Sequence, residues 1–241
     1  MISKVVKPYN ETESKKKQVE EMFDNISENY DFLNRLLSLK IDVYWRNQLE
    51  KRIIKLNPQK ILDTATGTSD LAILHAQKTQ AEIVGVDLSQ KMLDFAQIKV
   101  AKKHLEKRIQ LVKGDAENLP FQNDEFDAVT AAFGVRNFEN LEKGITEMGR
   151  VLKDNGKLLI LEFSKPSGFF APFFMFYFKK ILPSIGKIIS GDARAYTYLP
   201  DSVDSMPCGD EMKNLILKCG FREASYKRLT FGVATIYEGT K

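Results

Sequence analysis

Asp63, Asp87 and Asp115 stand at or just beyond the ends of short apolar runs in this sequence, and a fourth aspartate, Asp70, flanks the loop that follows Asp63. Between Asp63 and Asp70 the chain reads Thr-Ala-Thr-Gly-Thr-Ser, a loop without lysine or arginine. The carboxyl ends of parallel strands meet at one edge of a sheet, and open α/β sheets bind their ligands there. These residues therefore predict a site for a ligand that carries positive charge and donates hydrogen bonds.

The residue types in this site favour a nucleoside with a cationic group. Gly67, with Thr68 beside it, lets the backbone approach a ligand closely, and Asp87 is placed to accept hydrogen bonds from ribose hydroxyls. Asp115, followed by the small Ala116, suits an adenine amino group. The cofactor that we expect is S-adenosylmethionine, because its sulfonium and ammonium groups are attracted by these carboxylates.

A nicotinamide-dependent oxidoreductase is the alternative enzyme class. The loop holds one glycine, Gly67, where a dinucleotide fingerprint has three, and its acidic flanks would repel a pyrophosphate. Binding titrations with each cofactor separate the two classes.

Short apolar runs alternating with helical patterns must position these residues. The predicted strands, buried on both faces, lie at 61–63, 83–87, 109–112, 126–129 and 157–161. Helical spacing marks 69–77, 89–105 and 141–152, the last two behind the caps Ser89 and Asn140. This order predicts an α/β fold with a mostly parallel sheet and helices on both faces. A helix at 210–219 and two β-rich runs around Gly232 predict a terminal antiparallel pair.

The remaining segments frame this core within a single domain, 1–241. Residues 1–56 are expected to form a frayed arm, up to about residue 20, and then a helical cap, with apolar residues at helical spacing between 19 and 56. The cofactor-binding core covers 57–164, an inserted substrate lid 165–207, and the last helix and strands 208–241. Regular patterns are not expected between 164 and 207, where residues 168–178 hold seven aromatic side chains.

Composition excludes several other classes of protein. The chain has 241 residues, 43% of them hydrophobic and 28% charged, which is typical of a globular protein. Cys208 and Cys219 form no C-x-x-C pair, so we expect no disulfide framework, no zinc site and a cytoplasmic location. No run is apolar enough to cross a membrane, and a net charge of +4 is too small to predict nucleic-acid binding.

Three further segments resemble one family. They read YDFLNRLLS at 30–38, FGVRN at 133–137 and RVLKDNG at 150–156, the last leading to EFS at 162–164. Together with Trp45 they resemble the two signatures, and the loop after the fourth strand, of the UbiE/MenG/Coq5 quinone C-methyltransferases. The sequence departs from the family pattern at Leu33, at Asp42, where a histidine is common, and at Ala132, where a serine can contact the cofactor.

The resemblance implies a class I S-adenosylmethionine-dependent methyltransferase with a Rossmann-like fold. It implies methyl transfer to a ring carbon of demethylmenaquinol, the last step of menaquinone biosynthesis, with the corresponding step of ubiquinone biosynthesis as the alternative. A non-catalytic, cofactor-binding scaffold of a quinone-pathway complex is a further alternative, which the intact Arg136 and Asn137 oppose.

Methylation of a ring carbon needs electron density, which deprotonation of the neighbouring hydroxyl supplies. We expect Arg136 to stabilise the resulting phenolate or to orient a water molecule, and Asn137 and Tyr30 to hold the ring oxygens. His75, within an apolar helical pattern, and His104, among lysines, are not favoured as the base. The FGVRN loop also lacks the Pro-Pro-aromatic turn with which nucleic-acid amino-methyltransferases grip a base.

The aromatic segment from 168 to 178 suggests how a lipid quinol reaches the site. Its apolar surface beside Lys179 and Lys180 suits a membrane interface. We therefore expect a lid over 168–189 that admits the isoprenoid tail, peripheral contact with the inner face of the membrane, and a homodimer as the other way to cover these side chains.

Overall fold

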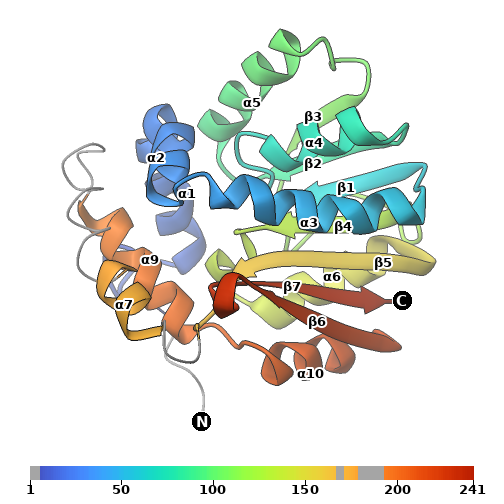
Figure 1. Ribbon diagram of the computed structural model, residues 1–241. Helices are drawn as coiled ribbons and strands as arrows, with labels where there is room; N and C mark the ends of the chain where they lie inside the picture. Colours follow the sequence, from blue (N-terminus) through green and yellow to red (C-terminus); the bar gives the residue numbers. More distant parts are fainter. Residues whose placement is uncertain (1–5, 167–170, 179–192) are drawn as a thin grey trace.

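The computed structural model describes residues 6–166, 171–178 and 193–241, and a seven-stranded sheet forms its centre (Figure 1). Its order is β3-β2-β1-β4-β5-β7-β6. The strands are β1 (Lys60–Thr64), β2 (Glu82–Asp87), β3 (Ile109–Lys113), β4 (Phe126–Ala132), β5 (Leu152–Phe163), β6 (Glu223–Leu229) and β7 (Ala234–Thr240).

Strand direction and order confirm the predicted sheet and place its ligand-binding edge. Neighbouring strands among β1 to β5 run parallel, whereas β7 runs antiparallel to both β5 and β6. The strand order reverses beside β1, which lies between β2 and β4. A crevice opens beyond the carboxyl ends of the strands at such a reversal, so the loops after β1, β2 and β4 are positioned to form a site.

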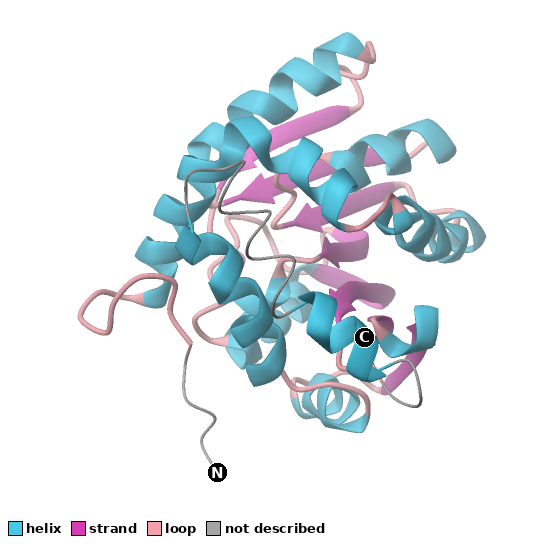
Figure 2. Ribbon diagram, turned by 60° about the vertical axis from the view of Figure 1, so that its left-hand side comes forward, coloured by secondary structure: helices cyan, strands magenta, loops and turns pink. Residues whose placement is uncertain are grey.

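Helices cover both faces of the sheet (Figures 1 and 2). They are α1 (Lys15–Ile26), α2 (Tyr30–Leu37), α3 (Ile41–Leu56), α4 (Asp70–Lys78), α5 (Gln90–Lys102), α6 (Leu141–Val151), α7 (Ala171–Phe176), α9 (Ala193–Ser205) and α10 (Asp210–Lys218), with short 3-10 turns η1 (Ser27–Asn29), η2 (Val135–Asn137) and η4 (Thr230–Gly232). The predicted caps are present: Ser89 accepts a hydrogen bond from Met92 N–H, and Asn140 accepts one from Lys143 N–H.

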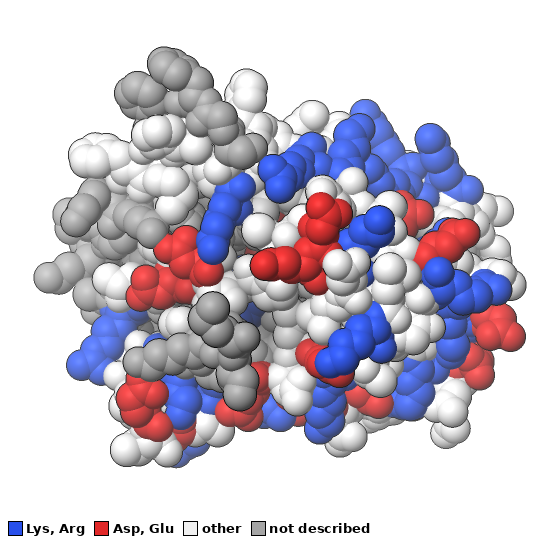
Figure 3. Space-filling view, turned by 90° about the horizontal axis from the view of Figure 1, so that it is seen from below, with Lys and Arg blue, Asp and Glu red and all other residues white. Residues whose placement is uncertain are grey.

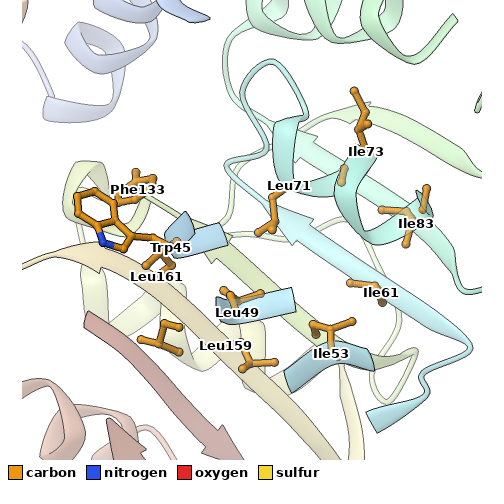
Figure 4. Close-up of a cluster of buried hydrophobic side chains, with 14 of the residues drawn as sticks. Trp45, Leu49, Ile53, Ile61, Leu71, Ile73, Ile83, Phe133, Leu159 and Leu161 are labelled. Atoms are coloured by element: carbon orange, nitrogen blue, oxygen red, sulfur yellow. The ribbon is translucent and has the colours of Figure 1, made fainter. Parts of the chain in front are cut away.

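Alternate residues of each strand supply two hydrophobic layers. Ile61 of β1 belongs to the layer beneath α3 and α4, whereas its neighbour Leu62 belongs to the layer beneath α6 and α10. In the first layer, Trp45 and Leu49 of α3 pack onto the sheet beside Phe133 (Figure 4). Phe133 follows β4, so this packing joins the helical cap to the loop that carries Arg136.

The amino-terminal segment corrects one expectation. Residues 6–20 are not a frayed arm, because α1 begins at Lys15 and the side chains of Lys15 and Gln18 are buried. Gln18 Oε1 accepts hydrogen bonds from the backbone N–H groups of Tyr9 and Asn10, at 2.7 and 2.9 Å. Hydrogen bonds of polar side chains order this segment, and such bonds leave no apolar periodicity in the sequence.

The expected lid is only partly described, and it contains a second correction. Residues 193–205 form α9 although Pro200 lies inside it, and Tyr198 and Val203 of this helix pack into a third apolar cluster with α1. Tertiary packing outweighs the low helix propensity of this stretch. The other lid residues, 167–170 and 179–192, which include Lys179 and Lys180, lie outside the described residues.

The aromatic side chains of α7 and the turn after it point in different directions. Phe178 is buried and lies 6.0 Å from Phe163, measured between ring centroids, and it stacks on Phe174 at 5.4 Å. Phe176, in contrast, is 63% exposed. The aromatic segment is therefore divided between an inner and an outer surface.

In the part of the chain that the structure describes, no helix is both long and apolar enough to cross a membrane. On the face seen in Figure 3, lysine and arginine side chains gather along one edge, and basic and acidic side chains are interspersed over the rest.

Candidate active site

A cavity of about 80 Å³ lies at the carboxyl ends of the strands, where the topology places a site. We call it the strand-end cavity. Four of the predicted cofactor residues line it together: Gly67, Asp87, Asp115 and Ala116. They come from the loop after β1, the last residue of β2 and the loop after β3, so the fold brings together residues that are far apart in the sequence.

Two backbone N–H groups hold the Asp87 carboxylate in this cavity. Gly67 N–H donates to Oδ2 at 2.7 Å and Ser89 N–H donates to Oδ1 at 2.9 Å. Gly67 has a φ of +54°, in the left-handed region that glycine adopts most easily. Burial raises the pKa of the Asp87 carboxyl to about 6, with the two N–H groups opposing this shift. The remaining lone pairs can accept hydrogen bonds from ribose hydroxyls.

Cofactor binding should therefore depend on pH through Asp87. Hydrogen bonds to a charged group are worth about 1.5 to 3 kcal/mol, so Asp87→Ala should weaken S-adenosylmethionine binding about tenfold or more. In the wild-type protein, protonation of Asp87 should weaken binding about tenfold between pH 7 and pH 5, because only the carboxylate accepts from both hydroxyls. Calorimetry of Asp87→Asn should give weak binding that varies little over this range. A wild-type affinity that is constant with pH would contradict this role.

Asp115 has a partner that sequence reasoning missed. Lys16 Nζ lies 2.5 Å from Asp115 Oδ2, and Glu117 N–H donates to Oδ1 at 2.9 Å. Lys16 also lines the strand-end cavity, so α1 forms one of its walls. Because Lys16 falls in the segment expected to be frayed, nothing in the sequence pattern placed it at this site.

The loop between β1 and α4 is held in a strained shape. Ala65 and Ser69 both have φ in the left-handed region, at +50° and +65°, and so does Phe133 in the loop after β4, at +60°. A Cβ at Gly134 would lie 2.5 Å from the Ala65 Cβ, so the two loops approach as closely as a glycine allows. Non-glycine residues in this conformation cluster at functional sites.

Thr68, the fifth predicted cofactor residue, lies on the other side of the loop. It lines a small space, the loop cavity, together with Asp63, Asp70 and Arg46. Its hydroxyl donates to Asp31 Oδ1 at 2.5 Å. The loop cavity and the strand-end cavity share Tyr30, Ala65, Gly67 and Ala132 in their walls.

The sequence predicts an acidic environment around this loop, and the structure shows that cations from other elements surround it. Three cations reach Asp70 from other elements: Arg35 Nη2 at 2.6 Å, Lys99 Nζ at 2.7 Å and Arg46 Nη2 at 3.9 Å. Burial acts against ionisation, yet these cations hold the pKa of Asp70 below its ordinary value.

Asp63 is buried and accepts hydrogen bonds from Thr66 and Thr130. The loop itself has no cation, as its sequence states, but the fold supplies three.

A second, larger cavity of about 340 Å³ adjoins this region, and we call it the large cavity. Its walls are mainly aromatic and aliphatic side chains, among them Phe23, Trp45, Phe163, Phe174 and Phe178. This volume is in the usual range for small-molecule sites. Trp45 Nε1–H donates to Thr230 Oγ1 at 2.7 Å and so fixes one wall.

The predicted catalytic residues meet where the cavities join. Tyr30 lines all three cavities, and Asn137 lines both the large and the strand-end cavity. Arg136 lines the large cavity. A group held by Asp87 can therefore face a ring in the large cavity across Tyr30 and Asn137.

Buried polar atoms without a hydrogen-bond partner concentrate at this place. Among the described residues there are five such side-chain atoms, and four of their residues line the large cavity: Arg46 Nε, Arg136 Nε, Asn137 Oδ1 and Tyr198 Oη. Burying a polar group without a partner costs about 1 to 3 kcal/mol, so a cluster of them points to a polar ligand. Tyr198 belongs to α9, within the segment where no regular structure was expected, and sequence reasoning missed it.

A buried carboxylate fixes Arg136. Glu162, at the end of β5, is fully buried, and Arg136 Nη1 donates to its Oε1 at 2.9 Å. Arg136 Nη1 also donates to the Phe133 carbonyl, and the guanidinium lies 5.5 Å from the centroid of Phe163. Lys15 Nζ donates to the carbonyls of Arg136 and Phe138, both at 2.8 Å, and burial lowers the pKa of this lysine to about 8.

The two remaining titratable candidates differ in their place, because Tyr30 lines the cavities and His75 does not. Burial raises the pKa of Tyr30 above its ordinary value. His75 is fully buried, with Nδ1 2.5 Å from Glu50 Oε2 and Nε2 3.2 Å from Thr130 Oγ1, and it is absent from the walls of these three cavities. This agrees with the expectation that His75 is not the base.

The residues in these cavities fit S-adenosylmethionine. Asp87 and Asp115 present acceptors for a ribose and an adenine amino group, and a second, smaller cavity beside Gly67 has both an acidic and a basic residue in its walls, Asp70 and Arg46. When bound, this cofactor supplies an electrophilic methyl group.

Solved structures share the fold. An S-adenosylmethionine-dependent methyltransferase from Thermotoga maritima has a TM-score of 0.63, 18% sequence identity, and coverage of 92% of this chain and 99% of its own. The [4+2]-cyclase SpnF has a TM-score of 0.65 at 17% identity, with 93% and 95% coverage. Because a cyclase has the same fold, the fold by itself does not identify the reaction.

Sequence relatives are more informative. Demethylmenaquinone methyltransferase from Bacteroides fragilis is 44% identical over 238 residues, covering 98% of this chain and 97% of the relative. The protein of the same name from Deinococcus radiodurans is 44% identical over 236 residues, with 97% of each chain covered. The ubiquinone/menaquinone biosynthesis C-methyltransferase UbiE of Geobacter sulfurreducens is 44% identical over 230 residues, with 94% and 90% coverage.

The family comparison agrees with the motifs, the fold and the composition of the cavities. A model of the ubiE/COQ5 methyltransferase family matches residues 11–241, which includes every residue discussed above except Tyr9 and Asn10. This chain therefore belongs to the ubiE/COQ5 family of S-adenosylmethionine-dependent methyltransferases.

Proposed function

We propose that this chain transfers a methyl group from S-adenosylmethionine to a ring carbon of demethylmenaquinol. The observation that supports this substrate most directly is the pair of unpartnered atoms on neighbouring residues, the donor Arg136 Nε and the acceptor Asn137 Oδ1, in the wall of a largely apolar cavity. A ring hydroxyl both donates and accepts hydrogen bonds, so a hydroquinone satisfies both atoms.

The residues around the ring then act on its oxygen atoms. Asn137 Oδ1 accepts a hydrogen bond from a ring hydroxyl and orients the ring. When that hydroxyl loses its proton to water at the open side of the cavity, Arg136 donates to the oxygen and stabilises the phenolate, which makes the ring carbon nucleophilic; after methyl transfer the methylated carbon loses its own proton to water and the ring becomes aromatic again. Burial raises the pKa of Tyr198 above its ordinary value, so its phenol stays protonated and donates to the second ring oxygen. The aromatic walls exclude water, which would otherwise weaken these interactions.

The names of the relatives, and not the residues of the large cavity, indicate which quinol ring is methylated. Those from B. fragilis and D. radiodurans carry the name demethylmenaquinone methyltransferase, whereas the G. sulfurreducens protein is named for both quinones. We favour demethylmenaquinol, and the corresponding ubiquinol precursor is the alternative.

Expression in a bacterium that lacks its own quinone C-methyltransferase tests the proposal. We expect menaquinone to replace demethylmenaquinone in lipid extracts, with a gain in mass of one methylene group. The physical reason is that Arg136 and Asn137 provide a donor and an acceptor for a ring hydroxyl of the hydroquinone. A host that makes both quinones distinguishes the two rings. If the extracts keep only demethylated quinones although the protein is folded and binds S-adenosylmethionine, the proposed substrate is wrong.

The mouth of the large cavity suits a lipid substrate and a lipid surface. Leu39 and Ile41 line the cavity and are 74% and 37% exposed, and Phe176 and Phe231 next to other lining residues are 63% and 71% exposed. We call these four residues the apolar rim. The backbone of Lys165 and the side chain of Arg228 lie beside Gly232, next to Phe231. Exposed apolar side chains with basic neighbours suit peripheral contact with an anionic membrane, from which the tail enters.

Phe176 and Phe178 form a matched pair to test the rim. Phe176→Ser should reduce co-sedimentation with anionic vesicles and raise KM for long-tailed quinols about threefold or more, since an exposed aromatic contributes mainly to lipid contact. A tail-less analogue should be unaffected. Phe178→Ser should instead lower thermal stability, because it removes a buried ring. If Phe176→Ser loses activity equally on both substrates, the rim is part of the hydrophobic core. If the variant loses a dimer that the wild type forms in sedimentation, the rim binds a second copy of the chain.

A further inference from the structure

We propose that Arg46 binds the carboxylate at the amino-acid end of S-adenosylmethionine, in the loop cavity. This inference rests on the cofactor of the family and is independent of which quinol is methylated. Arg46 is mostly buried and lines both the loop cavity and the large cavity, and its Nε has no hydrogen-bond partner.

The path of the cofactor leads to this place. Asp87 and Asp115 line the strand-end cavity, on one side of Gly67, and so fix the nucleoside there. The sulfonium joins the ribose to the amino-acid chain, and on the path that we propose the amino-acid end lies on the other side of the loop, where Thr68 and Arg46 line the loop cavity. The loop cavity begins at that point, because Tyr30 and Gly67 belong to the walls of both cavities.

The size of the loop cavity agrees with one small group. It measures about 20 Å³, enough for a group the size of a water molecule or one carboxylate oxygen pair, but not for a ring. Carboxylates are bound best by guanidinium groups, which present several donors in one plane.

Arg46 is held in place, and its neighbouring cations are engaged elsewhere. Its Nη1 donates to Asp42, which also accepts from Ser38 Oγ at 2.7 Å, and its guanidinium lies 5.4 Å from the centroid of Phe133. Arg35 bonds to Asp42 and Asp70, and Lys99 to Asp31 and Asp70. Neither of these two is among the residues that line the loop cavity. Arg46 is therefore the cation that a ligand in this cavity meets.

A ligand that differs only at the carboxylate gives the test. Calorimetry should show that the wild-type protein binds S-adenosylmethionine about tenfold or more tightly than decarboxylated S-adenosylmethionine, since a charge-assisted hydrogen bond is lost. Arg46→Met keeps the length and the packing on Phe133 but removes the donors. We expect this variant to bind the two ligands with nearly equal affinity, whereas Arg46→Lys should retain part of the discrimination.

The controls separate recognition from a structural effect. Arg52→Met, on the same helix and paired with Glu238 at 3.7 Å, should bind both ligands as the wild type does. If Arg46→Met weakens both ligands equally, Arg46 only shapes the loop and the proposal is wrong. If it leaves both affinities unchanged and raises KM for the quinol instead, Arg46 serves the ring, and the proposal is equally overturned. The titrations contain no quinol, so the two affinities test the role of Arg46 whether or not the proposed substrate is right.

Discussion

Arg136→Ala should lower kcat about a hundredfold or more, while the affinity for S-adenosylmethionine stays within about threefold. The variant loses a guanidinium that lines the large cavity and whose buried Nε has no hydrogen-bond partner, and with it the group that stabilises the developing phenolate. An unperturbed phenol has a pKa of about 10, so the site must favour the anion for the ring to react near neutral pH. Single-turnover kinetics with a short-tailed quinol, beside calorimetry of the cofactor, measures both quantities.

Two comparisons make this result specific. Arg150→Ala is a matched control, because Arg150 also pairs with a glutamate, Glu147, but is not among the residues that line the large cavity. It should leave kcat nearly unchanged. Melting curves must show that Arg136→Ala is folded at the assay temperature, since Glu162 loses its partner. If a folded Arg136→Ala turns over at close to the wild-type rate, the phenolate is stabilised elsewhere, with Tyr30 and then Tyr198 as the next candidates.

The nucleotide side of the site was predictable from the sequence because it follows local rules. A strand buried on both faces reads as an apolar run, and the residue after it lies at the edge of the sheet. Asp87 and Asp115 are such residues, and the strand-end cavity contains both. The loop around Gly67 was recognisable for the same reason, since its position after β1 and its composition are both local properties.

The polar contacts made across the fold were not predictable in this way. Lys16, Arg46 and Tyr198 reach the cavities from helices that are distant in the sequence, and each lies in a segment whose pattern indicates only helix or no regular structure. Which face of such a helix turns toward a site depends on tertiary packing. The cations that surround Asp70 show the consequence, because the loop is acidic in sequence and nearly balanced in charge in the structure.

Glu162→Ala should have the largest effect on folding, lowering the free energy of unfolding by about 3 to 5 kcal/mol. The Glu162 side chain is fully buried, and besides pairing with Arg136 Nη1 it accepts the N–H groups of Arg136 and Phe163. Its removal leaves a charged guanidinium in a poorly hydrated wall without a counter-ion. Urea denaturation measures the loss. Glu142→Ala, which breaks an exposed pair with Lys218, is the matched control and should cost less than about 1 kcal/mol.

A double variant and a conservative variant show whether Glu162 acts through Arg136. If the cost arises from an uncompensated charge, Arg136→Met with Glu162→Ala should lose less stability than the sum of the single variants. Glu162→Gln keeps an oxygen that accepts from Arg136 Nη1, so at a temperature where both are folded it should retain more of kcat than Glu162→Ala does. Additive stability losses, together with equal kcat for the two Glu162 variants, would reduce Glu162 to a general structural residue. The expected pattern makes it the positioning residue that directs the Arg136 donor toward the ring.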